Sequence, residues 1–169
     1  YADRRRLAYK AGLTAVELFK NGPTARQILS PSAIRNALRV DMALGGSTNT
    51  ILHLLAIARE AGYELSMSEI SRISDSTPQL CKLNPAGQDF ITDLNDVGGI
   101  QAVMAELNKK DLIEVEALTI DGTVSSRIAS LKGADGKVIH SVDAPYALDG
   151  GLAVLTGNLA PDGSVVKKG

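Results

Sequence analysis

The sequence predicts a mainly helical chain that ends in a β-rich segment. Up to Lys110, apolar residues recur mostly at the spacing of helix faces, and glycine, proline and serine separate the runs. After Asp111 the runs become short, alternate between apolar and polar residues, and are divided by turn dipeptides. The chain has 169 residues, of which 44% are apolar, enough for one ordinary domain or two small ones.

Composition excludes several classes of partner. The formal net charge is −1, and the basic cluster Arg4–Arg6 is short and lies within a helical pattern, so we expect no nucleic-acid partner. We expect no membrane partner either, because no apolar stretch is long enough to span a bilayer and no signal-peptide pattern opens the chain. A single cysteine indicates a reducing, cytoplasmic setting.

The N-terminal half predicts helices with recognisable ends. Helical spacing runs from Asp3 to Lys20 and stops at Asn21-Gly22-Pro23. A short helical turn is expected over Thr24–Leu29. Ser30 then serves as an N-cap with Pro31 in the first position of the next helix, which runs to Gly45.

The following helix, Thr48–Ala61, carries apolar residues on nearly every side, which predicts a central and largely buried position; Gly62 ends it. Ser66-Met67-Ser68-Glu69 fits a capping box and predicts a fourth helix over Met67–Ser74.

A turn-rich stretch follows, with Gln79–Leu83 extended and a turn at Asp93–Asn95. A further amphipathic helix begins near Ile100 and ends at Lys109-Lys110.

The C-terminal third predicts strands, with the boundary region at Asp111–Lys137. Leu152–Leu155 is a continuous apolar run, as expected for a strand buried on both faces. So few strands would leave edges unpaired, and the chain lacks an initiator methionine, so we expect it to be a piece of a longer protein. The strand predictions cover Glu114–Ile120, Lys137–Val142, Leu152–Thr156 and Ser164–Lys167.

The candidate site is the stretch Ala43–Thr50, at the start of the apolar helix. Its glycines permit close approach of the backbone, and its hydroxyl and amide side chains lie where free helical N–H groups would attract an anion. The alternative is a capped core helix with no ligand. The proposed substrate-binding residues are Gly45, Gly46, Ser47, Thr48 and Asn49.

For the other reactive residues we predict structural roles. His53, among leucines, is expected to be a neutral core histidine with one hydrogen bond, and His140 lies in a predicted strand beside Asp143. Cys81 is solitary and cannot by itself form a metal site, so a buried thiol is expected.

Two further groups leave alternatives open. Asp89, Asp93 and Asp96 lack the spacing of a calcium loop and are expected to be caps or solvated charges, although a divalent-cation site is the alternative. Asp149-Gly150-Gly151 is either a tight turn or a second place where the backbone approaches a ligand.

The sequence resembles the dihydroxy-acid and sugar-acid dehydratases. Four ordered motifs, which together cover nearly the whole chain, are similar to that family: Asp41–Thr50 with Leu52–Ala56, Pro78–Gly87, Asp93–Ile100, and Asp149–Leu155 with Gly157–Gly163.

The resemblance implies a hydro-lyase that converts 2,3-dihydroxy carboxylic acids to 2-oxo acids, with an iron–sulfur cluster and Mg²⁺, as a homodimer. It also implies an α/β fold overall, with residues 1–125 in the helical part of an N-terminal domain and 126–169 as linker and first strands of a β-barrel-like domain. The catalytic and metal-binding motifs of the family do not occur here. We therefore assign no catalytic or metal residue, expect this chain alone to bind neither cofactor, and expect it to be inactive in isolation.

The substrate class predicted first is the dihydroxy acids of valine and isoleucine biosynthesis. The alternatives are a sugar-acid dehydratase of gluconate, 6-phosphogluconate or xylonate type, and a non-catalytic module that binds a small anion.

Overall fold

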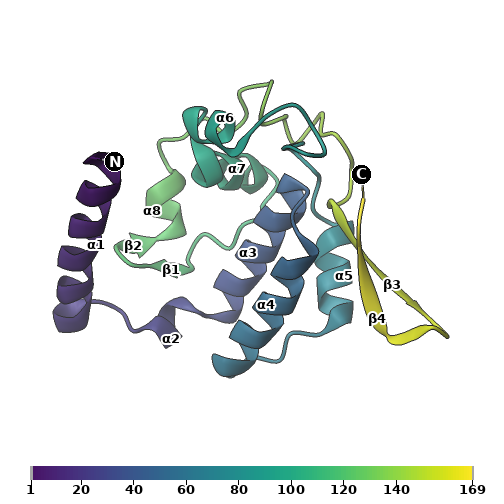
Figure 1. Cartoon of the computed structure of the whole chain (residues 1–169), viewed down its shortest axis with the longest axis horizontal. Coiled ribbons are helices and arrows are strands. Elements are labelled where there is room, and N and C mark those ends of the chain that lie inside the picture. Colours follow the sequence, from purple (N-terminus) through teal and green to yellow (C-terminus); the bar gives the residue numbers. More distant parts are fainter. Residues whose placement is uncertain (1, 169) are drawn as a thin grey trace.

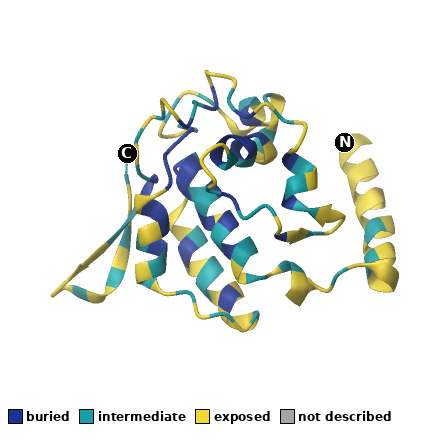
Figure 2. Ribbon diagram, turned by 180° about the vertical axis from the view of Figure 1, so that it is seen from behind, coloured by how far each residue is buried: buried dark blue, intermediate teal, exposed yellow. Residues whose placement is uncertain are grey.

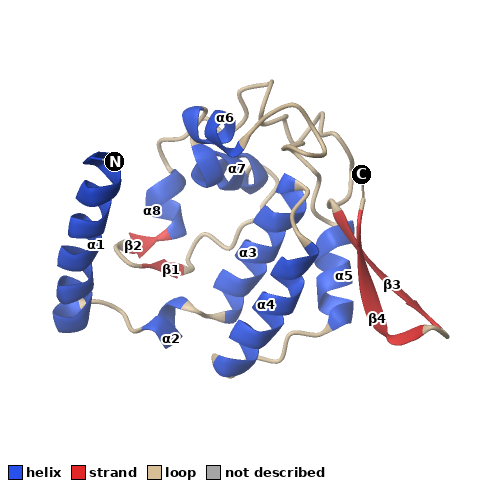
Figure 3. Cartoon of the chain, viewed as in Figure 1, coloured by secondary structure: helices blue, strands red, loops and turns tan. Residues whose placement is uncertain are grey.

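Helices dominate the structure, a computed structural model that describes residues 2–168 (Figure 1, Figure 3). The prediction of a mainly helical chain is confirmed, and the strands form two separate antiparallel pairs. No helix among the described residues is both long and apolar enough to cross a membrane. In chain order the elements are α1 (Ala2–Asn21), α2 (Ala25–Ile28), α3 (Pro31–Leu44), α4 (Thr48–Glu60), α5 (Met67–Asp75), α6 (Ile91–Asp96), α7 (Gly99–Asn108), β1 (Leu118–Thr119), β2 (Gly122–Thr123), α8 (Val124–Ile128), β3 (Leu152–Gly157) and β4 (Ala160–Lys167).

Helix α3 lies at the centre of the fold and contacts α4, α5 and α7. Its start and end are those that the sequence predicts. The Ser30 hydroxyl accepts a hydrogen bond from the N–H of Ala33, Pro31 occupies the first turn, and Gly45 ends the helix in the left-handed conformation. Local sequence therefore sets where this central helix begins and stops.

Two clusters of buried apolar side chains form the core. One cluster joins α3, α4 and α5 to the start of β3, where Leu152 is fully buried. The other joins α7 and α8 to the extended segment that holds Leu80 and Cys81 and to the loop that follows α8. Since α3 and its C-terminal end contribute to both clusters, the end of α3 lies where the two halves of the core meet.

Helix α1 stands apart from the core. None of the residues of Ala2–Asn21 is buried, and Figure 2 shows the helix almost entirely in the colour of exposed residues. Its apolar side chains face solvent, with Phe19 91% exposed. The helical spacing of the sequence is confirmed here, but α1 packs against no other element closely enough to bury it.

The prediction that the Thr48–Ala61 helix is largely buried is wrong. Only Ile51 and Ala58 of α4 are buried, and Leu52 is 66% exposed. A helix that is apolar all round needs cover on every side, whereas α4 packs on α3 and β4 and leaves its remaining surface exposed.

Two predictions for the C-terminal third are also wrong. Lys137–Val142 forms no strand, because side-chain acceptors replace a strand partner: Asp135 accepts from the N–H groups of Val138 and Ile139, and Glu106 accepts from that of Val142. The Glu114–Ile120 prediction reduces to the two residues of β1, and helix α8 was not foreseen.

Strands β3 and β4 confirm the last two strand predictions and form one antiparallel pair, in which Leu152 faces Lys167 and Val154 faces Val165. The expectation of burial on both faces is wrong, because only Leu152 of β3 is buried and Leu155 is 52% exposed. Within residues 2–168 the strands do not close into a barrel.

Candidate functional site

The candidate site is the short loop between α3 and α4. Gly45 has a φ of +74°, a conformation that a side chain would strain, and the N–H of Gly46 donates to the carbonyl of Asp41 at 2.9 Å. Ser47 is the N-cap of α4, and its hydroxyl accepts from the N–H of Asn49 at 3.3 Å. The predicted cap is confirmed, and Ser47, Thr48 and Asn49 are all exposed, so a ligand can reach them.

The Asp41 carboxylate forms hydrogen bonds with this loop and with the first turn of α4. Its Oδ1 accepts from the hydroxyl of Thr50 at 3.0 Å and from the N–H of Ser47 at 3.4 Å. Its Oδ2 is buried without a hydrogen-bond partner, and a Cβ on Gly46 would lie 2.3 Å from that atom. Burial raises the pKa of Asp41, although its hydrogen bonds oppose the shift. A side chain at position 46 would therefore displace the Asp41 carboxylate from its place under the loop.

Two segments distant in sequence meet the end of α3 here. The N–H groups of Leu80 and Cys81 both donate to the carbonyl of Ala43, at 2.8 and 3.0 Å. The N–H of Gly151 donates to the carbonyl of Met42 at 3.0 Å, and a Cβ on Gly151 would lie 2.3 Å from Cα of Gly45. Glycine at positions 150 and 151 thus allows this backbone to approach the candidate loop closely. The contact brings two of the sequence motifs together.

A cleft of about 230 Å³ with both polar and apolar lining residues lies over the loop. Gly45, Gly46 and Ser47 line it together with two basic residues, Lys82 and Lys167. Sequence reasoning did not single out these lysines. The only local signal at Lys82 was a basic residue directly after the apolar pair Leu80-Cys81, and nothing in the sequence of β4 indicated that Lys167 would line the same cleft.

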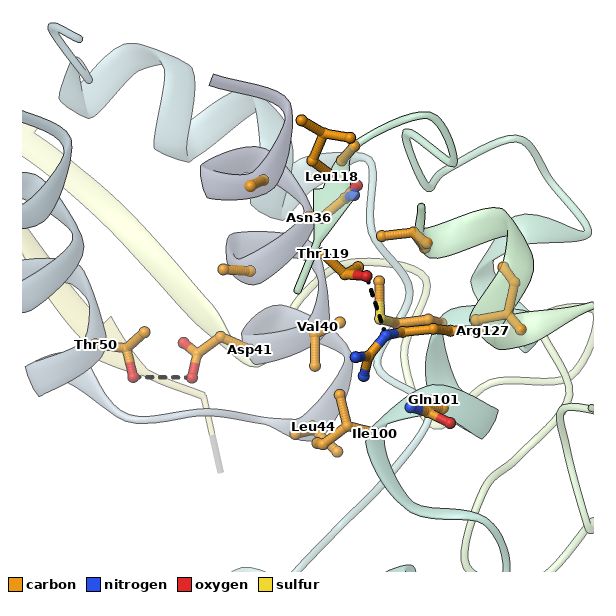
Figure 4. A pocket seen from close by; sticks show the side chains of 16 residues that line it. Asn36, Val40, Asp41, Leu44, Thr50, Ile100, Gln101, Leu118, Thr119 and Arg127 are labelled. Carbon is orange, nitrogen blue, oxygen red and sulfur yellow. Dashed lines mark hydrogen bonds between the residues drawn. The ribbon is translucent and has the colours of Figure 1, made fainter. Parts of the chain in front are cut away.

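A larger pocket of about 570 Å³ opens on another side of α3 (Figure 4). Its walls are mostly apolar, and three of its polar side chains already have partners: Asn36 bonds the backbone of Glu114, and Arg127 bonds Thr119 and Asp121. Figure 4 shows Asp41 and Thr50 joined to each other at its edge. With most of its polar side chains hydrogen-bonded within the protein, this pocket is a weaker candidate for binding a polar ligand.

The described residues do not fit an iron–sulfur ligand set. Cys81 is fully buried, as predicted, and burial raises the pKa of its thiol to about 12, which keeps it protonated at neutral pH. Cluster ligation requires several thiolates. Across residues 2–168, no group of three or more His, Cys, Asp and Glu side chains is placed to hold a metal ion.

The acidic residues and histidines take local roles. Asp93 accepts from the N–H of Phe90 at 2.6 Å, which confirms a cap at the start of α6. The prediction of a core histidine at position 53 is wrong, because His53 is exposed on the uncovered face of α4. His140 lies in a loop rather than a strand, and its ring stacks on Tyr146 with 3.9 Å between centroids.

The chain belongs to the dihydroxy-acid/6-phosphogluconate dehydratase family. Residues 1–127 match the family's N-terminal part and residues 137–169 match its C-terminal part. The resemblance found in the sequence is thereby confirmed. The candidate loop lies inside the N-terminal match, whereas Gly151 and Lys167 lie inside the C-terminal match.

Curated relatives carry the name dihydroxy-acid dehydratase. This chain is 54% identical to the protein of Desulfosudis oleivorans over 99% of its length, 53% identical to that of Acetivibrio thermocellus over 99%, and 54% identical to that of Caldicellulosiruptor saccharolyticus over 99%. In each comparison the chain spans about 30% of the relative's length.

Proposed function

We propose that this chain supplies a substrate-binding part of a hydro-lyase that dehydrates 2,3-dihydroxy carboxylic acids to 2-oxo acids, in valine and isoleucine biosynthesis. The observation that carries the proposal is the likeness to proteins named dihydroxy-acid dehydratase, at 54% and 53% identity over nearly the whole chain. The loop and cleft support it, because they offer exposed hydroxyl and amide groups beside basic side chains.

In this proposal the loop binds and orients the substrate. Gly45 and Gly46 permit backbone contact, while the side chains of Ser47, Thr48 and Asn49 hydrogen-bond hydroxyl or carboxylate oxygens. Loss of water requires removal of the proton at C2 and departure of the hydroxyl at C3. We assign neither step to a residue described here.

Further parts of the proposal rest on the family. A Lewis-acidic iron–sulfur cluster and Mg²⁺ would assist departure of the hydroxyl and hold the carboxylate, on residues outside this chain. Residues 1–125 would complete an N-terminal domain, 126–169 would lead into a β-barrel-like domain, and the whole enzyme would be a cytoplasmic homodimer.

A sugar-acid dehydratase is the second candidate. The family's own description includes 6-phosphogluconate dehydratase, and this supports sugar acids as the alternative substrate class. The names of the relatives favour the first proposal. Assays with both kinds of acid distinguish the two.

The test is a chimera in which this chain replaces the matched segment of the Desulfosudis oleivorans protein. We expect dehydration of 2,3-dihydroxyisovalerate by the chimera and none by the isolated chain. In the chimera, Ser47→Ala and Asn49→Ala should lower kcat/KM by about tenfold or more, because each removes a contact with the substrate.

The matched control is Ser66→Ala. Ser66 caps α5 through the N–H of Glu69 at 3.1 Å, so its loss removes a comparable cap away from the loop. Equal kcat/KM for the Ser47→Ala, Asn49→Ala and Ser66→Ala chimeras would contradict the proposed role of the loop, and turnover by the isolated chain would contradict the expectation that this chain alone is inactive.

A further inference from the structure

Three arginines line one pocket between α3 and α5, two helices that lie side by side (Figure 1). Arg35 and Arg39 are one turn apart on α3, and Arg72 lies in the last turn of α5. The pocket has a volume of about 200 Å³ and shares no lining residue with the cleft over the candidate loop. Its other lining residues are Glu69, Ile73 and Ser76.

Carboxylates balance the charge of Arg35 but not that of the other two arginines. Nη2 of Arg35 lies 3.0 Å from Oε2 of Glu114, and its Nη1 lies 3.8 Å from Oε1 of Glu69. Neither Arg39 nor Arg72 takes part in an ion pair found within residues 2–168. The carboxylate that lines the pocket, Glu69, is thus engaged with Arg35, and the pocket keeps an excess of positive charge.

Hydrogen bonds hold the guanidinium of Arg39 at this pocket. Its Nη1 donates to Oγ of Ser76 at 3.3 Å and to Oγ1 of the fully buried Thr77 at 3.1 Å. Both acceptors are neutral hydroxyls, so they orient the guanidinium without balancing its charge. Burial lowers the pKa of Arg39; Glu114 opposes this shift, and the charge of Arg35 adds to it. Arg39 is therefore a half-buried cation with no carboxylate in contact with it.

The chemistry of the pocket matches a phosphate group. Within residues 2–168 the side-chain hydrogen bonds of Arg39 use Nη1, which leaves Nε and Nη2 available to a ligand. Guanidinium groups bind phosphate oxygens through paired N–H donors, and two unbalanced arginines favour a doubly charged group over a monocarboxylate. Because sites for drug-sized ligands measure roughly 300–1,000 Å³, the pocket suits a small ion or one end of a ligand.

We propose that Arg39 and Arg72 bind a phosphate group in the pocket between α3 and α5. Arg35 adds to the positive potential and stays paired with Glu114. The group is free phosphate or the terminal phosphate of a small metabolite, since both present the same oxygens. This site goes beyond the proposed function: Arg39 and Asp41, which lines the loop cleft, are two positions apart and project to nearly opposite sides of α3.

The test is a titration of the isotope-labelled chain with inorganic phosphate, compared with chloride at equal ionic strength. The amide signals of Arg39, Arg72 and Ser76 should shift and saturate with phosphate, with a Kd on the order of 1 mM. Chloride should give small shifts that do not saturate, because it only screens charge.

A parallel titration with glycerol 3-phosphate distinguishes the two sources of the phosphate group. Tighter binding than that of inorganic phosphate assigns the pocket to the terminal phosphate of a metabolite, and weaker binding assigns it to the free ion. Saturation of the same amide signals supports the site in both cases.

Arg72→Gln is the decisive variant, because the Arg72 side chain is exposed and forms no ion pair within the described residues, so the fold does not depend on it. It should raise the Kd for phosphate about tenfold, as expected for loss of a hydrogen-bonded charge. Arg59→Gln is the matched control, since Arg59 is also exposed in the last turn of its helix, α4, and should leave the Kd unchanged.

Variants at position 39 test the second arginine. Arg39→Gln should raise the Kd about tenfold as well. Arg39→Lys keeps the charge but loses the paired donors, so it should restore part of the binding.

Three results would overturn the inference. Shifts with phosphate no larger than those with chloride would remove the site, and so would equal Kd values for Arg72→Gln and Arg59→Gln. Shifts of the same size at Arg59 and Arg72 would show general attraction of anions to basic side chains. None of these measurements depends on activity, so the proposed role of the loop is tested separately by the chimera.

Discussion

At the scale of single residues, the contact between Gly151 and Gly45 joins the two motif regions of the chain. A Cβ on Gly151 would lie 2.3 Å from Cα of Gly45, a backbone atom that cannot rotate away. We expect Gly151→Ala to lower the free energy of unfolding by about 1–3 kcal/mol, the usual cost of overpacking. Urea unfolding followed by circular dichroism measures this change.

Gly12→Ala is the matched control for that substitution. Gly12 lies in the exposed helix α1 with nothing within 4 Å of a Cβ, so alanine is tolerated and favours the helix locally. Equal effects of Gly151→Ala and Gly12→Ala would show that the close approach of the two segments does not contribute to stability.

A second prediction at the residue scale concerns how Glu106 makes the stability of the fold depend on pH. Burial by itself would raise the pKa of its carboxyl, but hydrogen bonds from Lys109 and from the N–H groups of Val142 and Ala134 outweigh burial and lower it. A lowered pKa stabilises the fold above the unfolded-state value of about 4.5, and this contribution is lost as the pH falls through the folded-state pKa.

Accordingly, Glu106→Gln should destabilise the chain by about 2 kcal/mol at pH 7, as expected for hydrogen bonds to a buried charge. The difference from wild type should shrink as the pH is lowered below about 4.5. Unfolding free energies measured from pH 7 to pH 3 test this, with the exposed Glu64→Gln as control. A difference that stays constant with pH would exclude a charged Glu106 as its source.

At the scale of elements, β3 shows how one strand divides between core and solvent. Leu152 is fully buried against α3 and α5, whereas Leu155 of the same strand is 52% exposed. We expect Leu152→Ala to cost about 2–5 kcal/mol and Leu155→Ala less than about 0.5 kcal/mol. Chemical denaturation of both variants measures the two values, and similar losses would mean that the whole strand is buried, as the sequence pattern implied.

Helix ends were the most predictable elements because their signals are local. Thr24, Ser30, Ser47 and Ser66 each cap a helix through a side-chain oxygen that accepts from a nearby N–H. Helix α8 was missed because it is a single short run of Val124–Ile128 between turn signals, where hydroxyl-bearing residues favour caps and turns over helix.

At the scale of the whole molecule, α1 is the part least connected to the rest. None of its residues is buried, so its removal exposes no core. We expect a chain that lacks residues 1–21 to unfold at the same urea midpoint as the full chain, within about 0.5 kcal/mol in free energy. A clearly lower midpoint would show that α1 packs on the core in solution.

The candidate site was predictable only in part. The glycine loop can be predicted from the sequence, because the left-handed glycine and the serine cap that follows it are encoded in neighbouring residues. The presence of Lys82 and Lys167 in one cleft cannot be predicted in this way, because that cleft exists only after β4 returns to the end of α3.

The sequence by itself determined the helical character of the chain, most helix ends and the family, since backbone preferences, caps and motif spelling depend on neighbouring residues. Only the tertiary structure decided which faces are buried and which residues converge: α4 is open on one side, Leu155 faces solvent, and Gly151 lies against Gly45. Burial depends on what packs against a surface, and the packing partners lie far away along the chain.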